Sequence, residues 1–142
     1  MDIFTWIYLV LFFFGIFFIM IFIILHYRNL KILFDSPKLK KYPSVSILVP
    51  AYNEEGNLED SVEHLIELEY PKEKLEIIII NDGSKDNTAK IAEKLSKKYK
   101  QIILLNKKNS GKADSLNQAI KIAKGELIAV VDADSYPNKD AV

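Results

Sequence analysis

Asp132 and Asp134 stand one residue apart, directly after the apolar run of residues 126–131. In an extended segment, side chains at positions i and i+2 point to the same side, so the two carboxylates are expected to converge. Carboxylates held this close repel each other unless a cation compensates their charge. Their oxygens suit Mg²⁺ or Mn²⁺, which usually complete the coordination shell with phosphate oxygens and water. The pattern therefore favours a divalent metal site over the alternative, a polar turn that closes a strand.

The position of Lys112 in the sequence suggests a phosphate group nearby. It opens a predicted helix, although a cation is unfavourable at the positive N-terminus of a helix. An anion shared by the lysine and the helix N-terminus removes that conflict; an ordinary surface lysine is the alternative. The sequence lacks G-x-G-x-x-G after its first strand-like run and lacks G-x-x-x-x-G-K-[ST], which argues against a Rossmann dinucleotide site and a P-loop.

Polar clusters follow each of four short apolar runs in the later part of the chain. The runs are rich in Ile and Val, as is typical of strands buried on both faces; they are residues 45–49, 75–80, 102–105 and 126–131. The clusters behind them read PAYNEEGN, NDGSKDNT, NKKNSGKADS and DADSYP. Ligands collect beyond the carboxyl ends of the strands in an open parallel sheet. We therefore expect the clusters to meet at one edge, although each could by itself be a simple turn.

Helical patterns separate these runs and occupy residues 58–66, 91–99 and 113–123. Asn57 is a candidate N-cap of the first helix, with Asp60 at its third position. Gly125 is expected to end the third helix. The alternation of strand and helix predicts an α/β fold with a parallel sheet and right-handed crossovers.

The N-terminal part of the chain has a different composition. Residues 4–25 are apolar apart from Thr5 and Gly15, and about 20 apolar residues allow a helix to cross the hydrocarbon layer. The run has no polar face, unlike a buried core helix, and Arg28 follows it instead of the small-residue cleavage site of a signal peptide. The predicted division is a transmembrane helix at 3–26, a basic juxtamembrane linker at 27–44 and an α/β part at 45–142.

The charges suggest a location and exclude one class of partner. Basic residues follow the span and none precedes it: Arg28, Lys31, Lys38, Lys40 and Lys41. Such residues stay on the cytoplasmic side, so we expect a single-pass protein of the cell membrane with its N-terminus outside and its α/β part in the cytoplasm. The lysines of the α/β part lack the interleaved aromatics of base-stacking surfaces, and nucleic acid is not an expected partner.

Taken together, the motifs SILVPAYNEE, IIIINDGSKDNT, NSGKADSLNQAI and GELIAVVDADS resemble the nucleotide-sugar half of a family 2 glycosyltransferase. The resemblance spans about residues 43–137 and implies the Rossmann-like GT-A fold. The segment GKADSLNQAI is most similar to processive, membrane-embedded polysaccharide synthases, such as those that make poly-N-acetylglucosamine, hyaluronan, chitin and cellulose.

This resemblance implies roles for residues on the nucleoside side of a donor site. Tyr52 would stack on uracil, Glu54 would lie at the ribose or uracil edge, and Asp82 would hydrogen-bond the uracil ring. On the phosphate side, Lys112 would reach the diphosphate. Asp132 would lie against the ribose and the metal, and Asp134 would coordinate the Mg²⁺ or Mn²⁺ that bridges both phosphates. The implied partners are a UDP-sugar donor and a glycan or lipid acceptor.

The chain departs from the family pattern after the DADS segment. Family members continue with an acceptor half that carries an acidic general base, and the processive ones continue with a Gln-x-x-Arg-Trp segment and further membrane helices. No residue of this sequence matches that base, so we expect a truncated donor module that is inactive alone. Two alternatives remain. One is a non-catalytic subunit that binds nucleotide or docks on a partner synthase chain; the other is a haloacid-dehalogenase-type phosphatase, whose Asp-x-Asp motif normally follows the first strand.

Overall fold

The computed structural model describes residues 2–34 and 41–141, which belong to two separate compact units. The first unit is the helix α1 (Ile3–Phe34), and its segment Ile3–Arg28 is long and apolar enough to cross a membrane. Apolar side chains lie on all sides of this segment, so it has no face suited to water. The helical backbone continues past residue 26, into the segment predicted as the linker. Residues 35–40 of the predicted linker lie outside the described residues.

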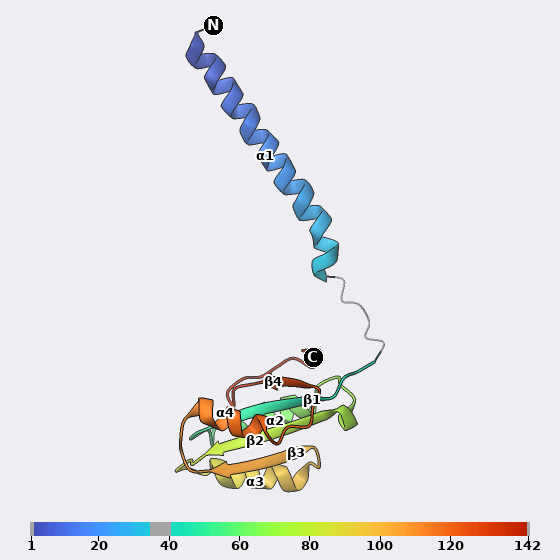
Figure 1. The fold of residues 1–142 in the computed structure, drawn as a ribbon, viewed down its shortest axis with the longest axis vertical. Coiled ribbons are helices and arrows are strands. Elements are labelled where there is room, and N and C mark those ends of the chain that lie inside the picture. Colours follow the sequence, from blue (N-terminus) through green and yellow to red (C-terminus); the bar gives the residue numbers. More distant parts are fainter. Residues whose placement is uncertain (1, 35–40, 142) are drawn as a thin grey trace. The chain divides into compact units, whose positions relative to one another are not determined.

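The second unit contains a parallel sheet built from the four predicted apolar runs. Its strands are β1 (Val45–Ala51), β2 (Leu75–Asp82), β3 (Ile102–Lys107) and β4 (Leu127–Val130). They lie in the order β3-β2-β1-β4, and every pairing is parallel (Figure 1). The chain moves outward from β1 through β2 to β3 and then returns to the other side of β1. Such a reversal opens a crevice at the carboxyl ends of the strands, here beside β1 and β4.

Helices cover both faces of the sheet, which confirms the predicted α/β fold. They are α2 (Leu58–Ile66), α3 (Thr88–Lys98) and α4 (Lys112–Ile120), with a short 3₁₀ turn at Lys72–Lys74 before β2. One core cluster joins α2 and α3 to side chains such as Ile47 and Ile77. A second cluster joins Ala119 of α4 to the alternate side chains, Leu48 and Ile78. Successive side chains of a strand point to opposite faces, so the central strands are buried on both sides.

The edge strand β4 departs from that prediction. Leu127, Ile128 and Val130 keep between 42% and 54% of their surface exposed. β4 pairs with β1 on one side, and the described residues place no further strand beyond it. An Ile- and Val-rich run therefore indicated a strand correctly but did not indicate burial on both faces.

Of two predicted helix ends, one is in place and one is wrong. Asn57 is the N-cap residue of α2, as predicted, but its side chain makes no capping bond; its amide Nδ2 donates instead to Glu54 Oε2 at 3.0 Å. Helix α4 ends at Ile120, well before Gly125. A Cβ on Gly125 would lie 2.4 Å from the backbone nitrogen of Ser46. The glycine therefore allows the chain to approach β1 closely rather than ending a helix.

Candidate functional site

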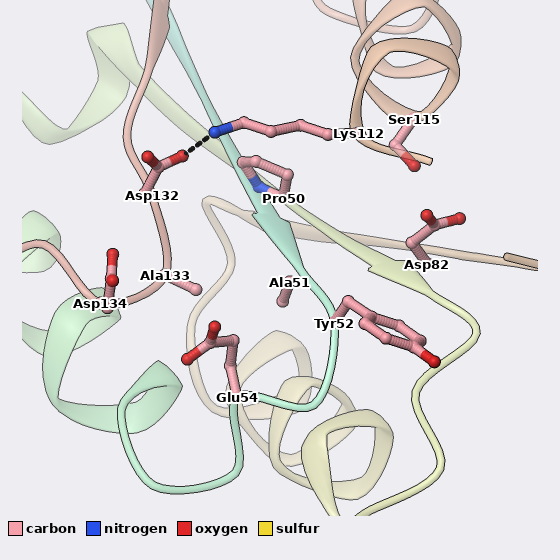
Figure 2. A pocket seen from close by; sticks show the side chains of 10 residues that line it. All are labelled: Pro50, Ala51, Tyr52, Glu54, Asp82, Lys112, Ser115, Asp132, Ala133 and Asp134. Carbon is pink, nitrogen blue, oxygen red and sulfur yellow. Dashed lines mark hydrogen bonds and ion pairs between the residues drawn. The ribbon is translucent and has the colours of Figure 1, made fainter. Parts of the chain in front are cut away.

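A pocket of about 270 Å³ lies at the carboxyl edge of the sheet. It contains every one of the predicted site residues, and Figure 2 shows their arrangement. The lining residues are Pro50, Ala51, Tyr52, Glu54, Asp82, Lys112, Ser115, Asp132, Ala133 and Asp134. Sequence reasoning did not include Pro50, Ala51, Ser115 or Ala133, because small or apolar residues carry no chemical signal of their own.

The strand register explains why distant segments meet here. Leu48 in β1 pairs with Val130 in β4, and the Val131 N–H donates to the Leu48 carbonyl at 3.0 Å. The segment after β4 therefore emerges beside the end of β1. Ala133 is buried in the core cluster between the two aspartates. The buried Ala133 side chain packs this segment against the core, while the carboxylates of Asp132 and Asp134 on either side of it line the pocket.

The loop after β1 is fixed by bonds to the loop after β2. Asn53 has a φ of 58°, a left-handed conformation in which asparagine is among the better tolerated residues. Its N–H donates to Ser84 Oγ at 3.1 Å, and its Oδ1 accepts the Lys85 N–H at 2.9 Å. Tyr52, directly before it, keeps 43% of its surface exposed at the pocket. The Tyr52 ring therefore lies at the surface of the pocket and is not packed in the hydrophobic core.

Glu54 is held in place at both its backbone and its side chain. Its N–H donates to Thr88 Oγ1 at 2.8 Å, and its carboxylate accepts from Asn57 Nδ2 at 3.0 Å. Thr88 is fully buried at the start of α3, so the bond anchors the loop to a rigid element. The Glu54 carboxylate is therefore an ordered acceptor on the pocket wall.

Asp82, at the end of β2, is the most tightly bonded acid of the pocket. Its Oδ1 accepts from Lys107 Nζ at 2.6 Å and from the Ser110 N–H at 3.0 Å. Its Oδ2 accepts the Gly111 N–H at 2.9 Å. Burial acts to raise the pKa of Asp82, but the Lys107 bond and the two N–H groups outweigh it and hold that pKa below its usual value. Asp82 therefore stays a charged acceptor.

Lys107 is the partner that sequence reasoning missed. It stands among other polar residues in the NKKNSGKADS cluster, where nothing separates it from an ordinary surface lysine. The sheet register identifies its partner, because Lys107 of β3 is paired directly with Asp82 of β2. Only the strand pairing makes the two residues neighbours.

Lys112 and Asp132 form an ion pair across the pocket. Lys112 Nζ lies 2.5 Å from Asp132 Oδ1, and both side chains are more than half exposed (57% and 52%). In Figure 2 the lysine reaches over Pro50 toward Asp132, while Tyr52 and Asp82 lie on the other side of the pocket. An exposed pair of this kind is worth about 0–1 kcal/mol. Both side chains can therefore leave this pair and contact a charged ligand at little cost in free energy.

The backbone around the two aspartates is not extended. β4 ends at Val130, and residues 133–134 form a turn closed by a bond from the Ser135 N–H to the Asp132 carbonyl at 3.0 Å. The prediction of an extended segment is therefore wrong, although both carboxylates line the same pocket. Asp132 points toward Lys112 and Asp134 does not (Figure 2).

The chain matches one family of known proteins over the whole pocket. A family model described as glycosyl transferase family 2 matches residues 46–142, which include every element of the pocket. The chain belongs to glycosyltransferase family 2. The phosphatase alternative is thereby set aside, in agreement with an Asp-x-Asp segment that follows β4 and not β1.

Individual relatives agree with this assignment. The chain is 40% identical over 108 residues to a probable glycosyltransferase, YdaM, of Bacillus subtilis, covering 73% of this chain and 26% of the relative. It is 41% identical over 97 residues to poly-beta-1,6-N-acetyl-D-glucosamine synthase of Staphylococcus aureus, covering 68% and 23%. The chain thus spans about a quarter of the length of these curated relatives.

Solved structures show the same fold. The mannosyltransferase PcManGT of Pyrobaculum calidifontis, in complex with GDP-Man and Mn²⁺, is similar with a TM-score of 0.68 and 27% identity, covering 82% of this chain and 36% of that one. S. aureus TarS 1–349 in complex with UDP is similar with a TM-score of 0.63 and 33% identity, covering 68% and 29%. The architecture of this glycosyltransferase family 2 chain is therefore of the GT-A type.

The donor atoms of the pocket suit a hard divalent cation. The described residues contain no cluster of three or more His, Cys, Asp or Glu side chains placed to hold a metal by themselves. Asp132 and Asp134 nevertheless line the same pocket. Mg²⁺ is commonly held by one or two carboxylates together with substrate phosphates and water. The residues present therefore fit a cation that binds with a phosphate ligand better than one bound alone.

Proposed function

We propose that this chain is the donor-binding part of a membrane-anchored glycosyltransferase, which holds a UDP-sugar and a divalent cation for transfer of the sugar to a glycan or lipid acceptor. The observation that carries the proposal is the convergence of Tyr52, Asp82 and Lys112 with the two aspartates in one pocket. A nucleoside diphosphate needs an aromatic face for its base, a hydrogen-bond acceptor at the edge of the base and a positive charge for its phosphates; Tyr52, Asp82 and Lys112 offer these three groups. Family membership supports the reaction class, and the UDP and UDP-GlcNAc complexes of the related TarS support the donor.

The nucleoside would occupy the side of the pocket that holds Tyr52 and Asp82. The exposed Tyr52 ring offers a stacking face, which is worth about 1–3 kcal/mol per base. Asp82, kept charged by its partners, can accept a hydrogen bond from the N–H of a uracil ring but offers none in return. Glu54 would serve the ribose or the uracil edge.

The diphosphate would occupy the side that holds Lys112. This lysine is the first residue of α4, so its ammonium group and the positive helix N-terminus act on the same anion. Asp132 and Asp134 would hold the cation. When bound, the cation supplies stabilisation of the negative charge on the departing UDP. Lys112 and Asp132 then exchange their contact with each other for contacts with the ligand.

The test is calorimetric titration of the full chain in lipid nanodiscs with UDP, GDP and uridine, with Mn²⁺ or with a chelator. UDP should bind more tightly than GDP, and Mn²⁺ should tighten UDP but not uridine. Tyr52→Ala should weaken uridine and UDP by about 5- to 100-fold, the equivalent of one lost stacking contact. Tyr8→Ala, in α1, is the matched control and should change neither affinity.

Two results would count against the proposal. Equal affinity for UDP and GDP in the unmutated chain would contradict the uracil assignment. Absence of nucleotide binding in the presence of Mn²⁺ would favour the alternative of a docking subunit, which would then co-purify with a separate synthase chain.

We further infer that α1 crosses the cell membrane once, with the N-terminus outside and the pocket in the cytoplasm. The support is the excess of basic residues after the span, including Arg28 and Lys41; Lys38 and Lys40 lie outside the described residues. The chain has no cysteine, so one introduced at either end is a unique label. An impermeant maleimide added to intact cells should label a cysteine before Met1 and spare one after Val142. The reverse pattern would contradict this orientation.

A further inference from the structure

Lys107 is a buried lysine that does not line the pocket. Its side chain keeps 7% of its surface exposed, the same fraction as that of Asp82. Beside the 2.6 Å bond to Asp82, its ammonium group donates to Ser110 Oγ, to the Lys108 carbonyl at 3.0 Å and to Ser115 Oγ at 3.3 Å. An ammonium group has three N–H donors, and the four acceptors around it are enough to use all of them. Charged side chains are rarely buried unless they are paired in this way.

These bonds connect the end of β3 to the start of α4. Asp82 accepts the N–H groups of Ser110 and Gly111, the two residues directly before the helix. Ser115, within the helix, is fully buried and faces both Lys107 and the pocket. The carboxylate thus has one oxygen shared between Lys107 and Ser110 and the other bonded to Gly111. Its position is set from three directions before any ligand binds.

We propose that Lys107 is a positioning residue, which fixes the Asp82 carboxylate as a hydrogen-bond acceptor on the pocket wall and so makes the pocket select a nucleobase that presents an N–H donor. The inference rests on the proposed nucleotide site and extends it to a residue that does not touch the nucleotide. A uracil ring presents an N–H to such an acceptor. A cytosine ring presents a bare nitrogen at the same position, which a carboxylate would repel.

The titration of the pair agrees with this geometry. The bond to Asp82 is the largest cause that raises the pKa of Lys107 above its usual value, and burial opposes it. Asp114, from α4, lies 3.4 Å from Lys107 and accepts from Ser110 Oγ. The other charged group that α4 places at this pocket is Lys112. Without Lys107, burial would act on Asp82 with less opposition and raise its pKa, so its protonated fraction would grow as the pH falls.

The experiment measures UDP and CDP affinities of the full chain in nanodiscs from pH 5.5 to 8.5, for the unmutated chain, Lys107→Met, Lys107→Arg and Lys108→Met. UDP and CDP also titrate themselves, but they do so identically for every variant. The UDP-to-CDP affinity ratio of each variant is therefore compared with that of the unmutated chain at the same pH, which removes this effect. In Lys107→Met the preference for UDP over CDP should fall about tenfold or more. The loss should grow as the pH falls, because a protonated Asp82 can donate to cytosine. Lys107→Arg should restore a pH-independent preference, and Lys108→Met, at the exposed neighbouring lysine, should match the unmutated chain.

The base preference separates this role from general loosening of the loop, which would weaken UDP and CDP equally. An unchanged UDP-to-CDP ratio and pH profile in Lys107→Met would overturn the inference while leaving the nucleotide site intact. Absence of UDP binding in the unmutated chain would overturn the proposed function and this inference together. If Lys107→Met does not fold, the neutral pair Asp82→Asn with Lys107→Met avoids a stranded buried charge. It should lose the UDP preference at every pH, and a retained preference would overturn the inference.

Discussion

Replacing Asp134 with asparagine is expected to make UDP binding independent of divalent cations. Asparagine keeps the size of the side chain and one oxygen but removes the charge that the cation needs. The loss of an outer-shell partner already costs about 10- to 100-fold in metal affinity, so the loss of a ligand should cost at least that much. In titrations with Mn²⁺, the Kd of UDP should rise to the value measured with a chelator. Uridine, which carries no phosphate, should bind as before.

The matched control for this variant is Asp140→Asn, an exposed aspartate outside the pocket. It makes the same chemical change and should keep the full dependence on Mn²⁺. If Asp134→Asn retained the tightening of UDP by Mn²⁺, Asp134 would not be a metal ligand. The DADS segment would then be a polar turn. The hydrogen bond from the Ser135 N–H to the Asp132 carbonyl is consistent with that alternative.

Replacing Lys112 with methionine is expected to have opposite effects on two ligands. A hydrogen bond to a charged group contributes about 1.5–3 kcal/mol, so UDP affinity should fall about 10- to 100-fold. Affinity for Mn²⁺ without nucleotide should rise instead, because Asp132 loses the ammonium group that now lies 2.5 Å from it. Electron paramagnetic resonance of free Mn²⁺ measures the second effect directly, since bound and free ions differ in signal.

The two effects together distinguish an exchange of partners from simple damage. Damage to the pocket would weaken both ligands, whereas the exchange predicts a gain for one of them. Lys121→Met, just after the last residue of the same helix, is the matched control and should alter neither affinity. If Mn²⁺ affinity did not rise in Lys112→Met, the ion pair would not be limiting access of the cation to Asp132.

Local patterns in the sequence indicated the strands and helices, and together with the family resemblance of the motifs they indicated the polar residues Tyr52, Glu54, Asp82, Lys112, Asp132 and Asp134 of the pocket. The run LEIIII at residues 75–80 contains four consecutive isoleucines, and this β-branched composition favours a strand. Tyr52, Asp82, Lys112 and the two aspartates follow such runs, and parallel strands bring their carboxyl ends to one edge whatever their order. These inferences depend on neighbours along the chain, and the structure confirms the elements and the shared location of these residues.

Other features depend on contacts between distant segments, and only the tertiary structure decided them. The position of β4 at the edge left Leu127 and Val130 exposed, although their run reads like that of a central strand. Gly125 reads as a helix end, but its role is a close approach to Ser46.

The pair of Lys107 and Asp82 shows the physical reason most clearly. A lysine is a surface residue by default, because burying an unpaired charge is costly. It becomes a buried positioning residue here because the pairing of β2 with β3 places a carboxylate 2.6 Å away. The sequence by itself determined which residues form strands, helices and a polar edge. Strand order and register, which arise from packing across the whole sheet, decided which of those polar residues line the pocket and which hold the others in place.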